Sequence, residues 1–285
     1  MRIVFATDLS DANRVALRSQ THLRCLANIG VREVHLFTVV PSNVSSGLPG
    51  MDAASDAREA LGSYRAVFED AGFDVETHVA RGAPFRRING LAERLPADMI
   101  VVGSRGQSPL RNRLIGDTAR NVARTAVVPL LVERVDVDEG TPTVAHDHLF
   151  RDVLYVTDFS DNAERAAEFL PRLRAATEHV TLLHVRGREQ MDSGSPESAA
   201  RDRLTALADD LSERMDVETA VSVRSGSAVE EILAEEERVG ATTTLLGARG
   251  TSRLRRLLLG SVSESVVARS DANVLLVPPA SVPPR

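Results

Sequence analysis

The chain repeats itself once, and this duplication restricts its possible folds more than any other feature. "IVFATDLSDANRVA" at residues 3–16 matches "VLYVTDFSDNAERA" at 153–166, and "MIVVGSRG" at 99–106 matches "TLLGARG" at 244–250. Between them, "VHLFTVV" matches "VTLLHVR" and "ARGAPFRRI" matches "VRSGSAVEEI", in the same order. The offset is 150 residues at the first match (3 to 153) and 144 at the last (103 to 247). Solenoid repeats have periods of about 20–50 residues, so we predict two copies of one domain.

A polar stretch separates the two copies. It reads "VDVDEGTPTVAHDHL" at 135–149 and contains both Gly and Pro, which is typical of a connection. We therefore predict a first domain at 1–137, a linker at 138–149 and a second domain at 150–285. His146 and His148 in this stretch are more typical of solvated side chains than of a metal site. A linker of this length lets the two copies pair with each other as a pseudo-two-fold dimer and so cover their apolar last strands.

Each copy alternates short apolar runs with helical patterns. In the first copy we expect strands at 2–7, 33–40, 74–80, 99–104 and 128–135, and helices at 10–28, 52–71, 84–95 and 118–125. Five strands and four helices in βαβα order predict an open parallel sheet with helices on both faces and right-handed crossovers. The second copy repeats this plan, and Pro171 predicts a kink or break in its first helix.

Composition excludes several classes of protein. The 43% apolar content is that of a globular chain, and no apolar run approaches the roughly 20 residues of a membrane span. The amino terminus reads as a strand rather than a signal peptide, and Cys25 is the only cysteine, so we expect a cytoplasmic protein without an intrachain disulfide. A net charge of −6 argues against nucleic-acid binding. The chain contains no lysine, which excludes a Walker A loop.

The chemistry-bearing residues follow the first and fourth strands. Ligands of open parallel sheets bind beyond the carboxyl ends of the strands, where strand order reverses. Asp158 follows the first strand of the second copy and would suit a ribose hydroxyl, an adenine amine or a metal ion. After the fourth strand, Gly247 and Gly250 permit close backbone approach, and Gly260-Ser261 begins a helix whose N–H groups and dipole favour an anion such as phosphate.

Both copies resemble the universal stress protein family. Its nucleotide-binding members carry G-x2-G-x9-G-[ST] after strand four and an Asp after strand one. "GARGTSRLRRLLLGS" at 247–261 and "VTDFS" at 156–160 fit these signatures. The resemblance implies tandem five-stranded parallel α/β domains that are Rossmann-like and similar to adenine nucleotide alpha hydrolases, paired two-fold through their last strands. It also implies a regulatory or stress-response protein that binds ATP or another adenine nucleotide, with Mg²⁺ as a possible companion of the nucleotide.

The resemblance also implies site residues. In the second domain the base would lie near Thr157, Asp158 and the backbone of Val185, and the phosphates would lie on Gly247, Arg249, Gly250, Gly260, Ser261 and Ser263. The corresponding, weaker set in the first domain is Thr7, Asp8, Val39, Gly103, Arg105, Gly106, Gly116 and Thr118.

The first copy departs from the motif at one position. Asp117 stands where the motif has a hydroxyl residue, and Thr118 is the neighbouring hydroxyl that could replace it. A carboxylate about 4 Å from a phosphate oxygen costs about 1 to 4 kcal/mol at effective dielectric constants of 80 to 20, unless a bridging Mg²⁺ reverses the sign. We therefore expect the second domain to bind nucleotide well and the first to bind it weakly or only with metal.

The sequence offers few groups for catalysis. No HExxH, GxSxG or kinase signature occurs. His35 lies two residues after Glu33 on an alternating strand, which favours a satisfied polar neighbour over a general base. At most slow ATP hydrolysis is expected. Two alternatives stay open: a nucleotide-using hydrolase or transferase of related α/β fold, and a dimerisation scaffold that binds no ligand. The sequence does not indicate the stress signal, the preference among ATP, ADP and AMP, or whether the full chain forms a homodimer.

Overall fold

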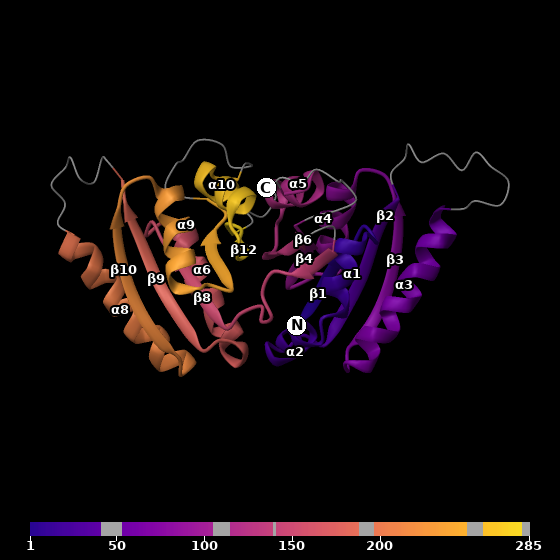
Figure 1. The fold of residues 1–285 in the computed structure, drawn as a ribbon, viewed down its shortest axis with the longest axis horizontal. Helices are drawn as coiled ribbons and strands as arrows, with labels where there is room; N and C mark the ends of the chain where they lie inside the picture. The colour runs from indigo at the N-terminus through magenta and orange to yellow at the C-terminus, as the bar shows by residue number, and fades with distance from the viewer. Residues whose placement is uncertain (41–52, 105–114, 139–140, 188–196, 250–258, 281–285) are drawn as a thin grey trace. The chain divides into compact units, whose positions relative to one another are not determined.

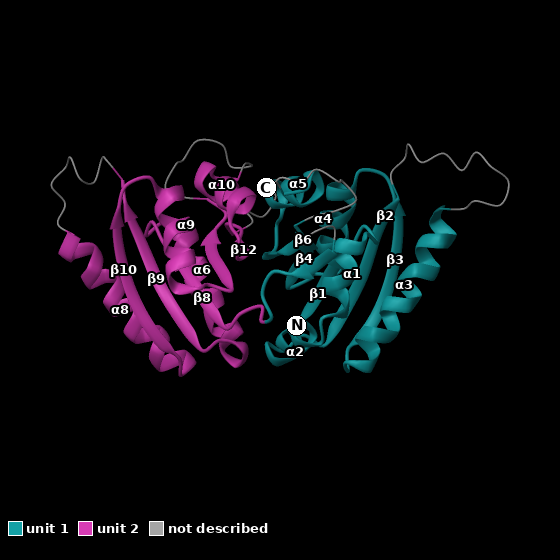
Figure 2. Ribbon diagram, viewed as in Figure 1, with its two compact units in different colours: residues 1–147 teal, residues 148–285 magenta. Residues whose placement is uncertain are grey.

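The chain folds into two compact units, residues 1–147 and 148–285, in a computed structural model (Figure 2). The structure describes residues 1–40, 53–104, 115–138, 141–187, 197–249 and 259–280. Each unit has a twisted parallel sheet covered by helices, and the five parallel strands alternate with helical segments in the same order in both (Figure 1). The predicted tandem α/β fold is therefore confirmed, whereas the two-fold pairing of the copies stays a prediction.

The sheet of the first unit has the strand order β5-β4-β1-β2-β3, and all its strand pairs are parallel. The strands are β1 (Arg2–Ala6), β2 (Glu33–Val40), β3 (Asp74–Arg81), β4 (Met99–Gly103) and β5 (Leu130–Glu133). The chain enters at β1, moves outward to β3 and returns to β4 on the other side of β1. Strand order thus reverses between β1 and β4, which places the predicted ligand-binding end at the carboxyl ends of these strands.

Helices cover both faces of this sheet. They are α1 (Asp11–Arg18), α2 (Gln20–Asn28), α3 (Ala53–Asp70), α4 (Pro84–Arg94) and α5 (Asp117–Thr125). On one face α3 contacts α1, and Phe68 meets Phe5 of β1 edge-to-face at 5.6 Å between ring centroids. On the other face α4 packs against α5. Because both faces are covered, the central strands β1 and β4 are buried almost throughout, whereas β3 is only partly buried.

The helix expected over 10–28 is two helices, so this expectation was wrong. Ser19 separates α1 from α2, and its side chain accepts a hydrogen bond from the backbone N–H of His22 at 3.3 Å. A serine side chain that caps a new helix competes with continuation of the old one. In the second unit the break at Pro171 is confirmed, because the first helix ends at Phe169 and a 3₁₀ helix follows.

The stretch between the copies is partly a β-hairpin. Strands β6 (Val135–Asp138) and β7 (Thr141–Val144) pair antiparallel, and both contact α1. Val135 is buried against Ala12 and Ala16 of that helix. Residues 138–144, which we expected to be linker, therefore fall within the first compact unit. Polarity alone misleads here because a two-stranded hairpin buries few side chains, so most of its sequence stays polar.

The second unit repeats the plan with the order β10-β9-β8-β11-β12, all parallel. Its strands are β8 (Asp152–Val156), β9 (His179–Arg186), β10 (Glu218–Ser225), β11 (Thr243–Gly247) and β12 (Asn273–Val277). Its helices are α6 (Asp161–Phe169), the 3₁₀ helix η1 (Leu170–Ala176), α8 (Glu197–Met215), α9 (Ala228–Val239) and α10 (Ser261–Arg269). Of the helices that the structure describes, none combines the length and the apolar character needed to cross a membrane.

Candidate functional site

The residues after the first strand of each unit form the same tight turn. In the second unit, the N–H of Phe159 donates to Thr157 Oγ1 at 2.9 Å, and the N–H of Ser160 donates to Asp158 Oδ1 at 3.1 Å. Phe159 adopts a φ of 59°, and its counterpart Leu9 in the first unit adopts 61°. Side-chain acceptors stabilise such a turn. One oxygen of each aspartate therefore has a structural task in addition to any role toward a ligand.

The first glycine after strand four makes room for the protein itself. A Cβ on Gly247 would lie 2.9 Å from the backbone oxygen of Asn162, and a Cβ on Gly103 would lie 2.6 Å from Oδ1 of Asn13. The side chain of Asn162 also joins the ends of β11 and β12. It accepts from the N–H of Arg249 at 2.9 Å and donates to the carbonyl of Val277 at 2.9 Å. We expected Gly247 to admit a ligand, and its immediate neighbour is this asparagine.

Replacing the two glycines by alanine should destabilise both units, but truncating the neighbouring asparagine should restore stability more at Gly103 than at Gly247. Gly103→Ala should cost about 1 to 3 kcal/mol by overpacking, and adding Asn13→Ala should recover about 1 to 2 kcal/mol because the crowding atoms are side-chain atoms. Gly247→Ala should recover less with Asn162→Ala, because its nearest neighbours are backbone atoms of residue 162. Urea unfolding in a double-mutant cycle measures both couplings.

Each unit can be followed separately in this experiment. The chain has no tryptophan and two tyrosines, and both are buried: Tyr64 lies in α3 of the first unit and Tyr155 in β8 of the second. Tyr155→Phe leaves Tyr64 as the fluorescent reporter of unit 1, and Tyr64→Phe leaves Tyr155 for unit 2. Equal coupling energies in the two cycles would contradict the distinction between side-chain and backbone crowding.

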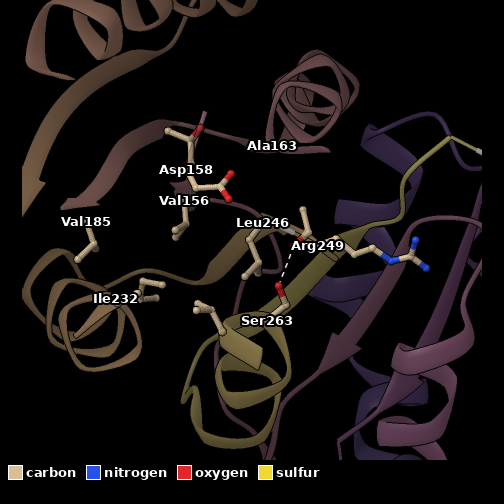
Figure 3. Close-up of a pocket in the computed structure, with 12 residues that line it drawn as sticks. Val156, Asp158, Ala163, Val185, Ile232, Leu246, Arg249 and Ser263 are labelled. Carbon is tan, nitrogen blue, oxygen red and sulfur yellow. Dashed lines mark hydrogen bonds between the residues drawn. The ribbon is translucent and has the colours of Figure 1, made fainter. Parts of the chain in front are cut away.

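A pocket opens at the carboxyl ends of β8, β9 and β11 in the second unit (Figure 3). It is lined by Val156, Thr157, Asp158, Ala163, Val185, Ala228, Ile232, Leu246, Gly247, Arg249, Val262 and Ser263. Six of the nine residues predicted from the sequence line it. The remaining lining residues, which the motifs did not indicate, are apolar and come from strand ends and from α6, α9 and α10. Their signal was the ordinary core periodicity, which does not distinguish a pocket wall from a buried contact.

The backbone N–H and C=O of Val185, in β9, are directed to the side of β8 but lie beyond its last residue. The N–H of Thr157 donates to the carbonyl of Leu183 at 2.9 Å, and β8 ends just before it at Val156. Alternate residues of a strand point their backbone groups to the same neighbour. The N–H and C=O of Val185 therefore point past the end of β8 toward the pocket. Val39 has the same relation to β1, because the N–H of Thr7 donates to Phe37 at 2.9 Å.

The amino terminus of α10 lies at the same pocket. The N-cap residue Gly260 has no side chain to accept from the first N–H groups of the helix. Ser263 lines the pocket, but its hydroxyl donates to the carbonyl of Gly247 at 2.9 Å, shown as the dashed line in Figure 3. A phosphate contact to the proton of Ser263 requires that this bond break. The helix N–H groups of α10 are therefore better placed as anion donors than this serine.

Other predicted residues are less directly placed. The N–H of Gly260 donates to the carbonyl of Ala248 at 2.9 Å, which joins the two ends of the intervening loop. The side chain of Arg249 extends away from Asp158 and Ser263 (Figure 3). Gly250, Arg105 and Gly106 lie outside the described residues.

The first unit differs from the second at the helix terminus. Asp117 is the first residue of α5, as Ser261 is of α10, and the N–H of Gly116 donates to Ser104 as that of Gly260 donates to Ala248. The exposed Thr118 corresponds to Val262, and the buried Ala119 to Ser263. The helix therefore begins with a carboxylate in unit 1 and a hydroxyl in unit 2, and the serine bond to the strand end has no counterpart at Ala119.

The described geometry agrees with comparisons to known proteins. The universal stress protein family matches residues 1–134 and 149–278. The chain belongs to the universal stress protein family. A universal stress protein of Methanocaldococcus jannaschii is 31% identical over 139 residues, which are 46% of this chain and 80% of that protein. Universal stress protein G of Escherichia coli O157:H7 is 33% identical over 141 residues, which are 46% of this chain and 93% of that protein.

A solved structure matches the tandem arrangement as a whole. The universal stress protein from Archaeoglobus fulgidus DSM 4304 is 26% identical, covers 97% of this chain and 98% of its own, and has a TM-score of 0.73. The two sequence relatives match about half of this chain, as expected when one copy of a duplicated chain is aligned. This universal stress protein thus carries two domains of the family, at residues 1–134 and 149–278.

Proposed function

We propose that this universal stress protein is a regulatory module that binds an adenine nucleotide, ATP in the first place, in the pocket of its second unit. One observation carries the proposal: an apolar pocket at the strand-order reversal is bounded by Asp158, the open backbone of Val185 and the uncapped amino terminus of α10. A universal stress protein that is 21% identical over 45% of this chain has been solved in complex with cAMP.

The pocket divides into parts that suit the parts of a nucleotide. Val156, Ile232 and Leu246 offer apolar surface for a purine ring, and the N–H and C=O of Val185 offer a donor and an acceptor to its edge. The carboxylate of Asp158 is an acceptor of the kind that ribose hydroxyls need. The first N–H groups of α10 and the positive end of its dipole suit the phosphates.

The pocket is better suited to holding the nucleotide than to hydrolysing it. Asp158 is the only carboxylate among the lining residues that the structure describes, and no histidine is among them. Asp158 already accepts a hydrogen bond in its turn and sits where the ribose would lie. A general base must lie within hydrogen-bond reach of the attacking water near the γ-phosphate. We therefore propose binding with, at most, slow turnover.

A reciprocal exchange at the helix termini tests the proposal. Isothermal titration of the wild type with ATP in the absence of Mg²⁺ should give one tight site. Ser261→Asp should weaken it by about 1 to 4 kcal/mol through repulsion of the phosphates. Asp117→Ser should add a second site of improved affinity in unit 1. Both residues are accepted in the first turn of a helix, so neither exchange should lower stability appreciably.

Two further variants localise the ligand. Ala228→Trp should abolish binding in unit 2, because Ala228 is half-exposed and its larger replacement fills the pocket without entering the core. Asp158→Asn keeps an acceptor for the turn and should weaken binding about ten-fold through loss of the charged acceptor. Two equivalent ATP sites in the wild type without Mg²⁺, or full affinity in Ala228→Trp, would overturn the assignment.

A further inference from the structure

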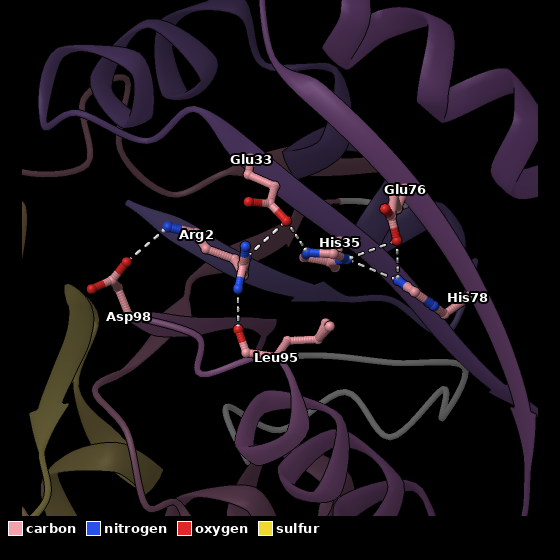
Figure 4. A network of polar contacts seen from close by, with 7 residues as sticks. All are labelled: Arg2, Glu33, His35, Glu76, His78, Leu95 and Asp98. Carbon is pink, nitrogen blue, oxygen red and sulfur yellow. Dashed lines mark hydrogen bonds and ion pairs between the residues drawn. The ribbon is translucent and has the colours of Figure 1, made fainter.

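We propose that the first unit has a site for a divalent transition ion of the zinc type, formed by His35, Glu76 and His78 on strands β2 and β3. One ligand atom from each of these side chains lies within 4.8 Å of the others. The cluster lies on the α4 face of the sheet beside its partly buried edge strand (Figure 4). The inference does not depend on the proposed nucleotide site.

Strand register brings the three side chains together. His35 is the direct partner of Glu76, and Phe37, two residues further along β2, is the partner of His78. Side chains two apart on a strand share a face, so all three ligands project from the same side. His35 is fully buried, His78 is half-buried and Glu76 is exposed. The buried imidazole of His35 is held in place, whereas the exposure of Glu76 leaves that side of the cluster accessible to a water ligand.

The distances suit tetrahedral coordination. His35 Nδ1 lies 2.9 Å from His78 Nε2, and Glu76 Oε2 lies 3.6 Å from the first nitrogen and 3.7 Å from the second. Zinc binds nitrogen and oxygen at about 2.0–2.2 Å, which places tetrahedral ligand atoms about 3.3 Å apart. The observed separations bracket this value. Shifts of a few tenths of an ångström in the half-buried and exposed side chains bring all three into range.

A further carboxylate orients the buried histidine. Glu33 Oε1 lies 2.8 Å from His35 Nε2, and Arg2 Nε lies 2.7 Å from the same carboxylate oxygen. A proton on Nε2 directed at Glu33 leaves the lone pair of Nδ1 facing His78 and Glu76 (Figure 4). A carboxylate behind a metal-binding histidine is the usual second partner of such sites. On metal binding, the hydrogen now shared between the two rings moves to His78 Nδ1 through solvent.

The second unit lacks the cluster and so provides an internal comparison. Strand register places Thr181, Ala220 and Ser222 at the positions of His35, Glu76 and His78. None of the three carries an imidazole or a carboxylate. The site is also separate from the adenine end of unit 1, because Val39 lies four residues further along β2, about 13 Å at the usual strand rise. Two positive charges oppose the metal: Arg94 of α4 acts on His78, and Arg2 lies behind Glu33.

The test is titration of the full chain with Zn²⁺ in competition with a chromophoric chelator, without nucleotide. The wild type should bind one equivalent tightly. His78→Ala and Glu76→Gln should each lose that equivalent, and both should keep the wild-type circular dichroism because the two side chains are not buried. Glu33→Gln should weaken binding about 10- to 100-fold. Arg94→Gln should bind more tightly.

A matched control separates this site from adventitious binding by histidine. His179 in unit 2 is half-exposed and lies 2.8 Å from Asp152 and 3.6 Å from Glu218. His179→Ala should retain the full equivalent of Zn²⁺. Co²⁺ should give the visible absorption of a tetrahedral ion in the wild type and in His179→Ala, but not in His78→Ala. Substoichiometric binding by the wild type, or equal loss in His78→Ala and His179→Ala, would overturn the proposal.

Discussion

Substitution of Glu133 by leucine is expected to lower the free energy of unfolding of unit 1 by about 3 to 5 kcal/mol, the usual cost of removing one partner from a buried ion pair. Glu133 ends β5 and contacts Nδ1 of His22 in α2, and both side chains are almost fully buried. His22 Nε2 also lies 2.7 Å from the carbonyl oxygen of His146. The pair thus ties together three segments that are distant in sequence.

The same substitution is expected to reverse the pH dependence of stability. Burial alone lowers the pKa of His22, but the hydrogen bond and charge of Glu133, aided by the carbonyl of His146 and the charge of Asp147, raise it above its ordinary value. A raised folded-state pKa gives stability that is fully present below the unfolded pKa of about 6.5 and is lost as pH rises through the folded value. Without Glu133, burial dominates, the folded pKa falls below 6.5, and stability then rises with pH.

Urea unfolding on both sides of pH 6.5 measures this reversal, with Tyr64 as the reporter in a Tyr155→Phe background. Glu69→Gln is the matched control, because its pair with Arg65 is an exposed i,i+4 contact on α3. That control should change stability by less than about 0.5 kcal/mol. Each variant's loss of unfolding free energy relative to wild type is compared across pH. If this loss changes with pH no more for Glu133→Leu than for Glu69→Gln, the buried pair does not carry the charge that we assign to it.

Substitution of Glu236 by alanine is expected to destabilise unit 2 by about 3 to 5 kcal/mol, since a buried donor left without its partner costs about 1 to 3 kcal/mol. The carboxylate of Glu236, in α9, accepts four hydrogen bonds at 2.7 to 2.9 Å. The donors are the hydroxyls of Thr244 and Ser270 and the backbone N–H groups of Asp271 and Ala272. Their loss frees the segment that leads into β12.

Two variants calibrate this result. Glu236→Gln should cost much less than alanine, because its carbonyl serves the two backbone N–H groups and its amide donates to the two hydroxyls, which can rotate to accept. Glu237→Ala, at an exposed position of the same helix, should change stability by less than about 0.5 kcal/mol. Tyr155 fluorescence in a Tyr64→Phe background reports the unfolding of unit 2. A cost for Glu236→Ala no larger than that for Glu237→Ala would show that water replaces the carboxylate without penalty.

Sequence patterns predicted correctly those features that depend only on residues within one short segment. The break at Pro171 follows from backbone chemistry within a few residues. The pairing of His35 with Glu33 at 2.8 Å follows from the two-residue period of a strand. Ser19 escaped the same reasoning because a serine is compatible both with the interior of a helix and with a cap, and the energy difference is small.

Two of the predicted site residues, Gly247 and Ser263, line the pocket and also contact other parts of the protein that the sequence did not indicate. The sequence suggested that Gly247 makes room for a ligand. In the structure, the atoms that leave no room for a side chain at this position belong to Asn162, in the helix α6 that follows β8. Ser263 looked like a phosphate donor, and its proton goes to the carbonyl of Gly247. Neither partner is adjacent in sequence, so no local pattern indicates that these groups are already engaged.

The sequence alone determined that this chain is a duplicated βα domain, because hydrophobic period and turn residues are properties of short segments and of their order along the chain. It also predicted a ligand site at the carboxyl ends of the strands. Only the tertiary structure decided which distant side chains meet. It placed His78 against His35, and Glu133 against His22, because the register between strands and the seating of a helix depend on packing over the whole unit.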